Sequence, residues 1–316
     1  MSAAHKLLPP ALLFILGNAW AAQYMSAKIM GEAGLDPVAA LMDVHILLAA
    51  VFGTCLGLRR RFFLPTANQA GFFFAVALVG SVASILAELA AAPHIPASLL
   101  TIIVAMAPVF TLVLTLAMGT ERLNTRSVAA ILLGLTATLA ILLPSAEMSG
   151  SLLWIGVAFI APLGFGAMGV IMSAKWPDRL DPLQVAFGLA AAGLIMLVPL
   201  SAFTGSALMI HGNFGTGDWA MLIFGLSFVI EFSIFAILTR IGGAVYASCA
   251  DFIATGLGLF WAWVIFAEVP TPWMWIAAIA SVSTIFIIKQ SDNRTLPTNE
   301  SRSAPPHAAA PEVLSS

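Results

Sequence analysis

Residues 96–118 read PASLLTIIVAMAPVFTLVLTLAM and contain no charged side chain. The hydrocarbon core of a bilayer is about 30 Å thick, and a helix that rises about 1.5 Å per residue needs about 20 apolar residues to cross it. A run of this length is too long for a strand, and a helix satisfies all its own backbone hydrogen bonds in lipid. The stretch therefore predicts a transmembrane helix.

Nine further runs of similar length and composition surround this one. The ten predicted helices lie at about residues 8–26, 38–57, 70–91, 96–118, 127–143, 151–173, 183–203, 218–239, 243–266 and 272–289. The predicted fold class is an all-α integral membrane protein with ten transmembrane helices. Residues 291–316 are polar and rich in proline, so we expect a disordered tail there.

The composition excludes a water-soluble protein. Hydrophobic residues make up 60% of the 316 residues and charged residues only 9%, whereas a soluble domain has about 25% charged residues. The net charge of −2 offers no basic surface for nucleic acid, and we expect no such partner. Cys55 and Cys249 stand inside apolar runs and provide neither a disulfide framework nor a cysteine metal site.

The basic residues predict the orientation, because Lys and Arg accumulate in the short loops on the cytoplasmic side of a membrane. If the N-terminus is inside, twelve of the 13 Lys and Arg residues lie inside and only Lys28 lies outside. The twelve are Lys6, Arg59, Arg60, Arg61, Arg122, Arg126, Lys175, Arg179, Arg240, Lys289, Arg294 and Arg302. We therefore expect both termini in the cytoplasm.

Short strings recur at a nearly constant distance along the chain. Met25-Ser26-Ala27-Lys28 recurs as Met172-Ser173-Ala174-Lys175, an offset of 172 − 25 = 147 residues, and Leu35-Asp36-Pro37 recurs as Leu180-Asp181-Pro182, an offset of 180 − 35 = 145. Each match has the same place in the helix pattern. The matches predict a duplication, with one five-helix repeat in residues 1–145 and a second in residues 146–290.

A third match, between Glu121 and Glu268 at an offset of 268 − 121 = 147 residues, indicates how the repeats are oriented. Five spans are an odd number, so the second repeat enters the membrane from the opposite side. Glu121 is accordingly expected inside and Glu268 outside. Inverted repeats recur in secondary transporters, where the substrate site lies near the bilayer midplane and opens to each side in turn.

Three strings, taken with the two five-helix repeats, resemble a known family. They are Ala107-Pro108-Val109-Phe110, Gly119-Thr120-Glu121-Arg122-Leu123 and Gly242-Gly243-Ala244-Val245-Tyr246-Ala247-Ser248. Over about residues 8–289 the chain resembles the drug/metabolite transporter superfamily, and within it the EamA family. The resemblance implies a bacterial inner-membrane permease, often an exporter of amino acids or other small metabolites.

The chain departs from the family pattern at two places. His45 stands where many relatives carry an arginine, and Thr255 or Gly256 stands where the second repeat often has the counterpart of Pro108. Because of these departures, the resemblance does not identify the substrate or the coupling ion.

Four carboxylates lie inside predicted spans: Asp43, Glu88, Glu231 and Asp251. An ionisable group in a bilayer is costly and marks a pathway, a proton relay or a buried pair. Glu231 lies nearest the middle of its span and Asp251 lies in the inner half, so these two are the first candidates for substrate binding or proton coupling. Asp43 and Glu88 lie nearer the outer surface. The alternative role for all four is hydrogen bonding that locks helix packing.

One face of the predicted ninth helix carries small and polar residues. Ala247, Ser248, Asp251, Thr255 and Gly258 follow the spacing of a single helical stripe. Such a stripe suits a solute pathway, and it also suits close helix packing, because small residues let backbones approach. The spacing leaves both interpretations open.

Pro108 is expected to interrupt the hydrogen-bond ladder of the fourth helix, and Gly256 and Gly258 are expected to loosen the ninth. Interrupted helices at corresponding places in two repeats point to a central binding site. Freed carbonyls there, together with Thr101, Thr111, Ser248 and Thr255, are candidate substrate contacts. An ordinary kink is the alternative.

The first two helices add three candidates. Trp20 and Gln23 are three residues apart and share a helix face, where an aromatic ring beside an amide suits an organic solute. Trp is also common as apolar filler. Asp43 and His45 are two residues apart, so at most one faces a shared cavity. His45 is a candidate proton carrier or a hydrogen-bonded interface residue.

These features favour a secondary active transporter that has no bound cofactor or metal and is coupled to protons or exchanges solutes. A passive channel or facilitator needs the same spans and is the alternative. The sequence has no Walker-type loop and no His-Glu-x-x-His motif, and its 5 His are scattered, so neither ATP use nor an enzyme is predicted. The expected partners are a small-molecule substrate, protons and the lipid bilayer, and a homodimer is left open.

Overall fold

The computed structural model describes residues 3–118, isolated positions between 125 and 136, and residues 151–206, 214–248, 250–276, 278 and 279. These parts are almost entirely helical, and no strand occurs in them. The predicted all-helical class is confirmed. Most of the predicted helices at 127–143 and 272–289, and the tail 291–316, lie outside the described residues. The count of ten helices therefore stays a prediction.

The helices before residue 119 are α1 (Ala3–Glu32), α2 (Pro37–Leu58), α3 (Ala67–Val76), the π-helix η1 (Ala77–Ala83), α4 (Ser84–Ala91), the 3-10 helix η2 (Ala92–His94), α5 (Ala97–Val104) and α6 (Ala107–Ala117). Those after residue 150 are α8 (Ser151–Ala158), α9 (Ile160–Ala174), α10 (Pro182–Thr204), α11 (Thr216–Ser248) and α12 (Ala250–Phe266).

Six helical segments of the described chain are long and apolar enough to cross a membrane, and each coincides with a predicted run. They are Pro37–Leu58, Ala67–His94, Ala97–Ala117, Leu152–Ala174, Pro182–Thr204 and Thr216–Leu238. A shorter apolar segment, Ile253–Phe266, lies in α12. The first predicted run, 8–26, lies within α1.

Two of the early spans contain irregular turns. The third span consists of α3, the π-helix η1 and α4 in succession. The fourth breaks at Ala105 and Met106, between α5 and α6, and Pro108 follows in the first turn of α6. Proline has no backbone N–H to continue the ladder. The predicted interruption of this helix is confirmed.

The predicted loosening of the ninth helix is wrong, because α12 runs without interruption through Gly256 and Gly258. A Cβ atom at Gly258 would lie 2.5 Å from the side chain of Thr101 on α5, whereas one at Gly256 would have no described atom within 4 Å. Gly258 therefore lets α12 approach α5 closely. The predicted end of the eighth helix at residue 239 also differs, since α11 continues to Ser248.

The recurring Leu-Asp-Pro string begins a helix in both places. The side chain of Asp36 accepts a hydrogen bond from the N–H of Ala39 at 2.8 Å, and that of Asp181 accepts one from the N–H of Gln184 at 2.9 Å. Each aspartate caps its helix, α2 or α10, and a proline stands in the first turn, where no N–H is needed. The two copies of the string thus have the same local structure.

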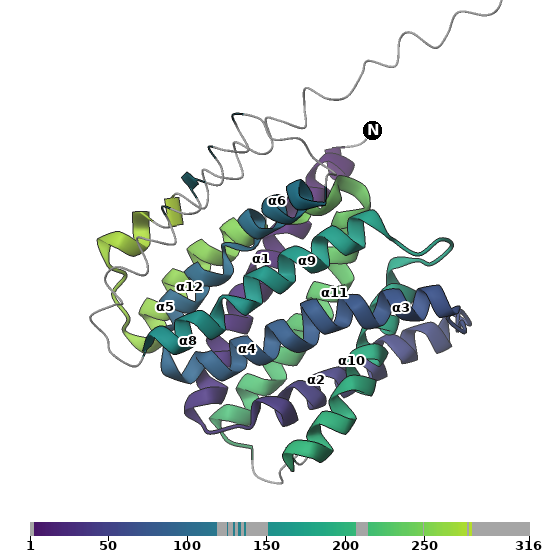
Figure 1. Ribbon diagram of the computed structural model, residues 1–316, viewed down its shortest axis with the longest axis horizontal. Helices are drawn as coiled ribbons and strands as arrows, with labels where there is room; N and C mark the ends of the chain where they lie inside the picture. The colour runs from purple at the N-terminus through teal and green to yellow at the C-terminus, as the bar shows by residue number, and fades with distance from the viewer. Residues whose placement is uncertain are drawn as a thin grey trace, which may run out of the picture.

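The helices lie side by side in one bundle (Figure 1), with α5, α6 and α12 along one side and α2, α3 and α10 along the other. Helix α1 packs against α11 and α12, while α9 packs against η1, α4 and α6. Helix α2 packs against α10, and α5 against α12. Most of the buried side chains between them are apolar.

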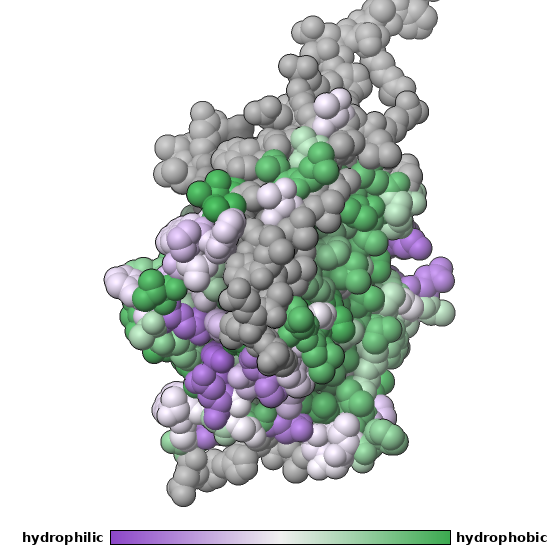
Figure 2. All heavy atoms as spheres, turned by 60° about the vertical axis from the view of Figure 1, so that its left-hand side comes forward, coloured by the Kyte–Doolittle hydropathy of each residue, from purple (hydrophilic) through white to green (hydrophobic). Residues whose placement is uncertain are grey.

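The outside of the bundle is also apolar. Figure 2 shows a broad hydrophobic expanse, with hydrophilic side chains gathered in a separate area. Exposed large residues include Ile195 and Val198 on α10, Ile223 and Leu226 on α11, and Trp263 on α12. Soluble monomers rarely expose continuous apolar areas of this extent. The surface therefore fits contact with lipid chains.

Candidate functional site

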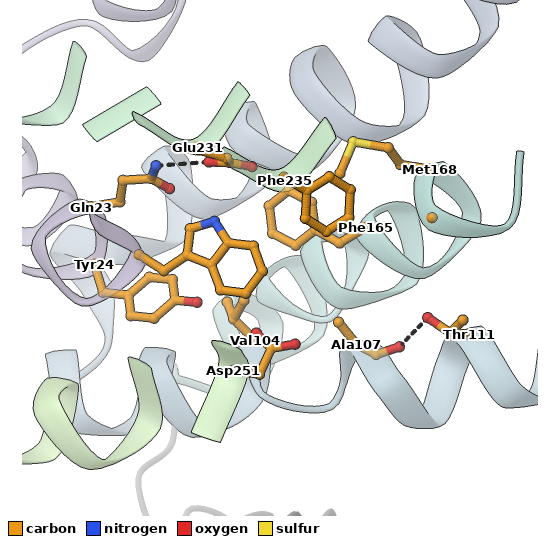
Figure 3. A pocket seen from close by; sticks show the side chains of 12 residues that line it. Gln23, Tyr24, Val104, Ala107, Thr111, Phe165, Met168, Glu231, Phe235 and Asp251 are labelled. Carbon is orange, nitrogen blue, oxygen red and sulfur yellow. Dashed lines mark hydrogen bonds between the residues drawn. The ribbon is translucent and has the colours of Figure 1, made fainter. Parts of the chain in front are cut away.

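Six helices enclose a cavity in the interior of the bundle (Figure 3). Its lining residues are Trp20, Gln23 and Tyr24 of α1, Val104 of α5, Ala107 and Thr111 of α6, Phe165, Met168 and Gly169 of α9, Glu231 and Phe235 of α11, and Asp251 of α12. About 40 Å³ is open to the centre of a water molecule, which is room for a few waters. The cavity therefore draws on both predicted repeats.

Glu231 is 6% exposed and joins the two predicted repeats through a hydrogen bond. The Nε2 atom of Gln23 on α1 donates to Oε2 of Glu231 on α11 at 2.8 Å. The indole of Trp20 lies beside the same carboxyl group. A second void of about 20 Å³, lined by Met172 and Leu189 among others, lies against Glu231 as well. Glu231 thus stands between two small internal spaces.

Asp251 is also 6% exposed and comes from the first turn of α12. Its carboxyl group points into the cavity (Figure 3), and no described residue forms a hydrogen bond or ion pair with it. The carboxyl groups of Asp251 and Glu231 interact electrostatically. Two acidic groups therefore face one small, largely apolar space.

A third carboxyl group, that of Glu88 on α4, lies outside the lining of the cavity but interacts electrostatically with Glu231. Glu88 is 1% exposed, and neither of its carboxyl oxygens has a hydrogen-bond partner among the described residues. The Tyr24 hydroxyl interacts electrostatically with Glu88, Glu231 and Asp251. The three acids therefore form one electrostatic group around the cavity, with Tyr24 among them.

Aromatic rings form much of the remaining wall. The ring centroids of Trp20 and Phe235 lie 6.0 Å apart, which joins α1 to α11. Phe165 of α9 lies close to Phe235 in Figure 3, and Met168 extends beside them. The wall is therefore apolar and aromatic, and the carboxyl groups and Gln23 provide its polar contacts together with the hydroxyls of Tyr24 and Thr111.

The structure places His45 and Asp43 outside the lining of this cavity. His45 is fully buried between α2, η1 and α10. Its Nδ1 lies 2.9 Å from the carbonyl oxygen of Leu41 and its Nε2 lies 2.6 Å from Oγ of Ser81. The Leu41 carbonyl can only accept, so Nδ1 carries a proton. A neutral ring then accepts from the Ser81 hydroxyl through Nε2. Asp43 is half-buried on the same helix.

Pro108 and Thr255, which the sequence also predicted, do not line the cavity. Pro108 is buried in the first turn of α6, next to the lining residue Ala107. Thr255 is buried one turn beyond Asp251, and its hydroxyl donates to the carbonyl oxygen of Asp251 at 2.6 Å. Ser248 ends α11, and its side chain lies outside the described residues.

Sequence reasoning did not single out Tyr24, Phe165, Met168, Phe235 or Val104 as lining residues. Most are apolar residues in apolar helices, so nothing in their type separates a cavity wall from a lipid-facing side. One signal existed for Val104: it precedes Asp251 by 251 − 104 = 147 residues, the offset of the repeat.

Glu268, in the segment after α12, is bonded to the start of α5. Its Oε1 accepts from the N–H of Ala97 at 2.9 Å, and its Oε2 accepts from the N–H and the hydroxyl of Ser98 at 2.9 and 2.7 Å. Glu268 therefore caps the N-terminus of α5, where the helix dipole favours a carboxylate.

At the same end Lys28 is buried and bonded to backbone. Its Nζ donates to the carbonyl oxygen of Ile95 at 3.0 Å and lies 3.4 Å from Oε1 of Glu32. Within the described ranges, no group of three or more His, Cys, Asp or Glu side chains is placed to hold a metal ion.

Comparison with known proteins gives two positive results. Residues 8–143 match the model of the EamA-like transporter family. A solved structure described as "Crystal structure of protein" has a TM-score of 0.61 and 17% sequence identity, over 90% of this chain and 98% of that chain, which shows a shared fold. No curated protein matches.

The resemblance stated from the sequence is confirmed over residues 8–143. Together with the apolar helices, the match over residues 8–143 indicates a multi-pass membrane protein.

Proposed function

We propose that this chain, whose residues 8–143 match the EamA-like transporter family, is a secondary active transporter that exports a small metabolite across the bacterial inner membrane. The observation that carries the proposal is the enclosed cavity in which Glu231 and Asp251 of the second repeat face Trp20 and Gln23 of the first. Ionisable groups inside membrane-spanning helices mark substrate paths and proton relays. In this proposal both termini lie in the cytoplasm.

The packing of the helices supports an inverted repeat. At an offset of 147 residues the first span corresponds to the sixth, the third to the eighth and the fourth to the ninth. The contact of α1 with α11 then corresponds to that of α9 with η1 and α4, and the contact of α1 with α12 corresponds to that of α9 with α6. Val104 and Asp251, which also correspond, both line the cavity. A two-fold axis would pass through this region.

Alternating access requires one end of the cavity to close while the other opens. In the proposed orientation Glu268 and the start of α5 lie on the outer side. They belong to different repeats, so the bonds of Glu268 to Ala97 and Ser98 must break when the repeats separate there. The corresponding inner residue, Glu121, lies outside the described residues. Glu268 thus supplies an outer closing contact.

In this proposal Glu231, which lines the cavity, couples transport to protons. When the cavity opens outward, its carboxylate takes up a proton and the solute leaves. When the cavity opens inward, the proton leaves to the cytoplasm and solute enters. In this structure the bond from Gln23 holds the carboxyl group against α1. An inward proton gradient then drives export.

The test is transport by purified protein in vesicles that contain a mixture of small metabolites, with solutes measured by mass spectrometry. Under an imposed proton gradient we expect at least one solute to accumulate against its own gradient. Equilibration without accumulation would instead identify a passive channel or facilitator. Failure of every solute to move would overturn transport.

Variants test the residue assignment in the same vesicles. Glu231→Gln and Asp251→Asn keep the shape of each side chain and remove its charge, so each should lower accumulation at least about tenfold, as expected for the loss of a charged buried contact. Asp178→Asn is the matched control, because it removes one charge from an exposed position away from the cavity. Normal accumulation by both cavity variants would show that these acids serve packing alone.

A further inference from the structure

We propose that a cluster of basic side chains at one end of the bundle binds the headgroup of an anionic phospholipid. The cluster lies on two loops, residues 59–66 between α2 and α3 and residues 175–181 between α9 and α10. Both loops lie at the right of Figure 1. In the proposed orientation this end faces the cytoplasm. The inference goes beyond transport, because it names a lipid partner at a surface outside the cavity lining.

Contacts between the two loops hold them side by side. Nη1 of Arg61 in the first loop lies 3.0 Å from Oδ2 of Asp181 in the second. The side chain of Gln184, in the first turn of α10, donates to the carbonyl oxygen of Arg61 at 3.2 Å. Thr66 of the first loop and Lys175 of the second also line one groove. The basic residues of both loops therefore belong to one surface.

This basic cluster has an excess of positive charge. The two loops contain five basic and two acidic residues, a net charge of 5 − 2 = +3; the basic residues are Arg59, Arg60, Arg61, Lys175 and Arg179, and the acidic residues are Asp178 and Asp181. Asp181 is already paired with Arg61 and caps α10. The other four basic side chains are exposed, and none of them forms an ion pair with a described residue. They can therefore bind an anion from outside the chain.

Two arginines of the cluster occupy backbone positions that favour glycine. Arg60 has a φ of 53° and Arg179 a φ of 65°, and only one other non-glycine residue of the described chain has a positive φ. In this conformation a Cβ atom crowds a carbonyl oxygen, which glycine avoids. The number of inner charges is enough to orient a membrane protein, so orientation does not explain cations at these two positions. Their placement favours a specific use of the charge.

Exposed apolar side chains beside the arginines favour a lipid over a soluble anion. Leu58, Phe62 and Leu64 are 81%, 64% and 94% exposed. A phospholipid offers acyl chains to such side chains and a phosphate to the arginines, whereas a soluble anion would contact the arginines alone. Arginine binds phosphate oxygens through paired hydrogen bonds, and basic pockets on the cytoplasmic side of membrane helices bind anionic headgroups.

The experiment measures lipid binding by the purified full-length protein in detergent. Phosphatidylglycerol and phosphatidylcholine with the same acyl chains are added at equal concentration, and native mass spectrometry counts the bound molecules of each. We expect phosphatidylglycerol to bind at least about tenfold more tightly, because several basic residues each attract the anionic headgroup. It should also raise the unfolding temperature more, because a ligand of the folded state stabilises it. Equal binding of the two lipids would overturn the inference.

A double variant assigns the preference to the arginines. Arg59→Gln with Arg60→Gly removes two charges and no ion pair between described residues. Glycine suits the backbone at position 60, so in phosphatidylcholine the variant should unfold at the wild-type temperature or higher. Its affinity for phosphatidylglycerol should nevertheless fall at least about fivefold. An unchanged preference in this variant would place the lipid elsewhere and overturn the inference.

The matched control changes an acid of the same two loops. Asp178→Asn raises their net charge by one, so it should bind phosphatidylglycerol at least as tightly as the wild type does. Weaker binding by this variant would contradict recognition by charge.

A soluble headgroup separates a lipid from a free phosphate ester. Glycerophosphoglycerol has the headgroup of phosphatidylglycerol without its acyl chains, and we expect it not to displace the lipid at equal concentration. Displacement would identify a site for a soluble anion and overturn the lipid assignment. Transport has no part in these measurements, so this inference and the proposed function can fail separately.

Discussion

Glu268 accepts two hydrogen bonds from Ser98, one from its backbone N–H and one from its hydroxyl, although the two residues are 170 positions apart. No side chain of α5's own N-cap residue, Pro96, caps this helix. The first turn of α5 thus depends on a carboxylate from the other predicted repeat. This contact therefore joins the stability of α5 to the packing of the two predicted repeats.

A double-mutant cycle on this pair tests how strongly it acts. We expect Glu268→Gln and Ser98→Ala each to lower the unfolding temperature in detergent, because a charged cap on orphan N–H groups is lost or weakened. The coupling energy should be at least about 1 kcal/mol. Glu32→Gln is the control, since that side chain is half exposed in its pair with Lys28. Additive effects of the two changes would contradict the contact.

The proposed orientation places the segment after α12 outside the cell and the segment between α2 and α3 inside. Single cysteines at Val269 and Leu64, which are 75% and 94% exposed, test this after Cys55 and Cys249 are replaced by alanine. A membrane-impermeant maleimide should label position 269 in intact cells and position 64 only after lysis. The reverse pattern would invert the proposed topology.

Two neighbouring glycines of α12 should respond oppositely to alanine. Gly258→Ala should lower the unfolding temperature, because its new Cβ would meet Thr101 at 2.5 Å. Gly256→Ala has open space and should leave stability unchanged or raise it, by up to about 1 kcal/mol from helix propensity. Equal destabilisation by both would show that space at Thr101 does not decide the effect.

His45 should contribute to the free energy of unfolding and not to proton coupling. Its ring is bonded to Leu41 and Ser81 and lies outside the cavity lining. We expect His45→Ala to destabilise the protein by about 1–3 kcal/mol, the cost of leaving a buried polar partner unsatisfied. The number of protons moved per solute should stay the same. A changed proton ratio at unchanged stability would restore His45 as a proton carrier.

Much of the helical pattern could be predicted because continuous apolar runs leave little choice in lipid. The predicted run 38–57 differs from α2 by one residue at each end. The end of the eighth helix was predicted at residue 239, with Arg240 in the loop that follows, whereas α11 continues to Ser248.

The residues of the candidate site could likewise be predicted only in part. Rare polar residues in apolar helices drew attention to Trp20, Gln23, Glu231 and Asp251, and all four line one cavity. His45 is as rare a residue type, but its direction depends on helix packing that periodicity alone does not fix. Apolar lining residues such as Phe235 carry no signal in their type, since the lipid-facing sides are equally apolar.

The π-helix η1 determines how the residues that follow it are rotated about the helix axis. A π-helix accommodates one more residue than a regular helix of the same course, and each residue of an α-helix advances the chain by about 100° around its axis. Removing one residue between Ala77 and Ala83 would swing everything beyond it by that angle, carrying Glu88 away from its neighbours Tyr24 and Glu231. The extra residue of η1 thus determines the direction in which Glu88 points around the helix axis.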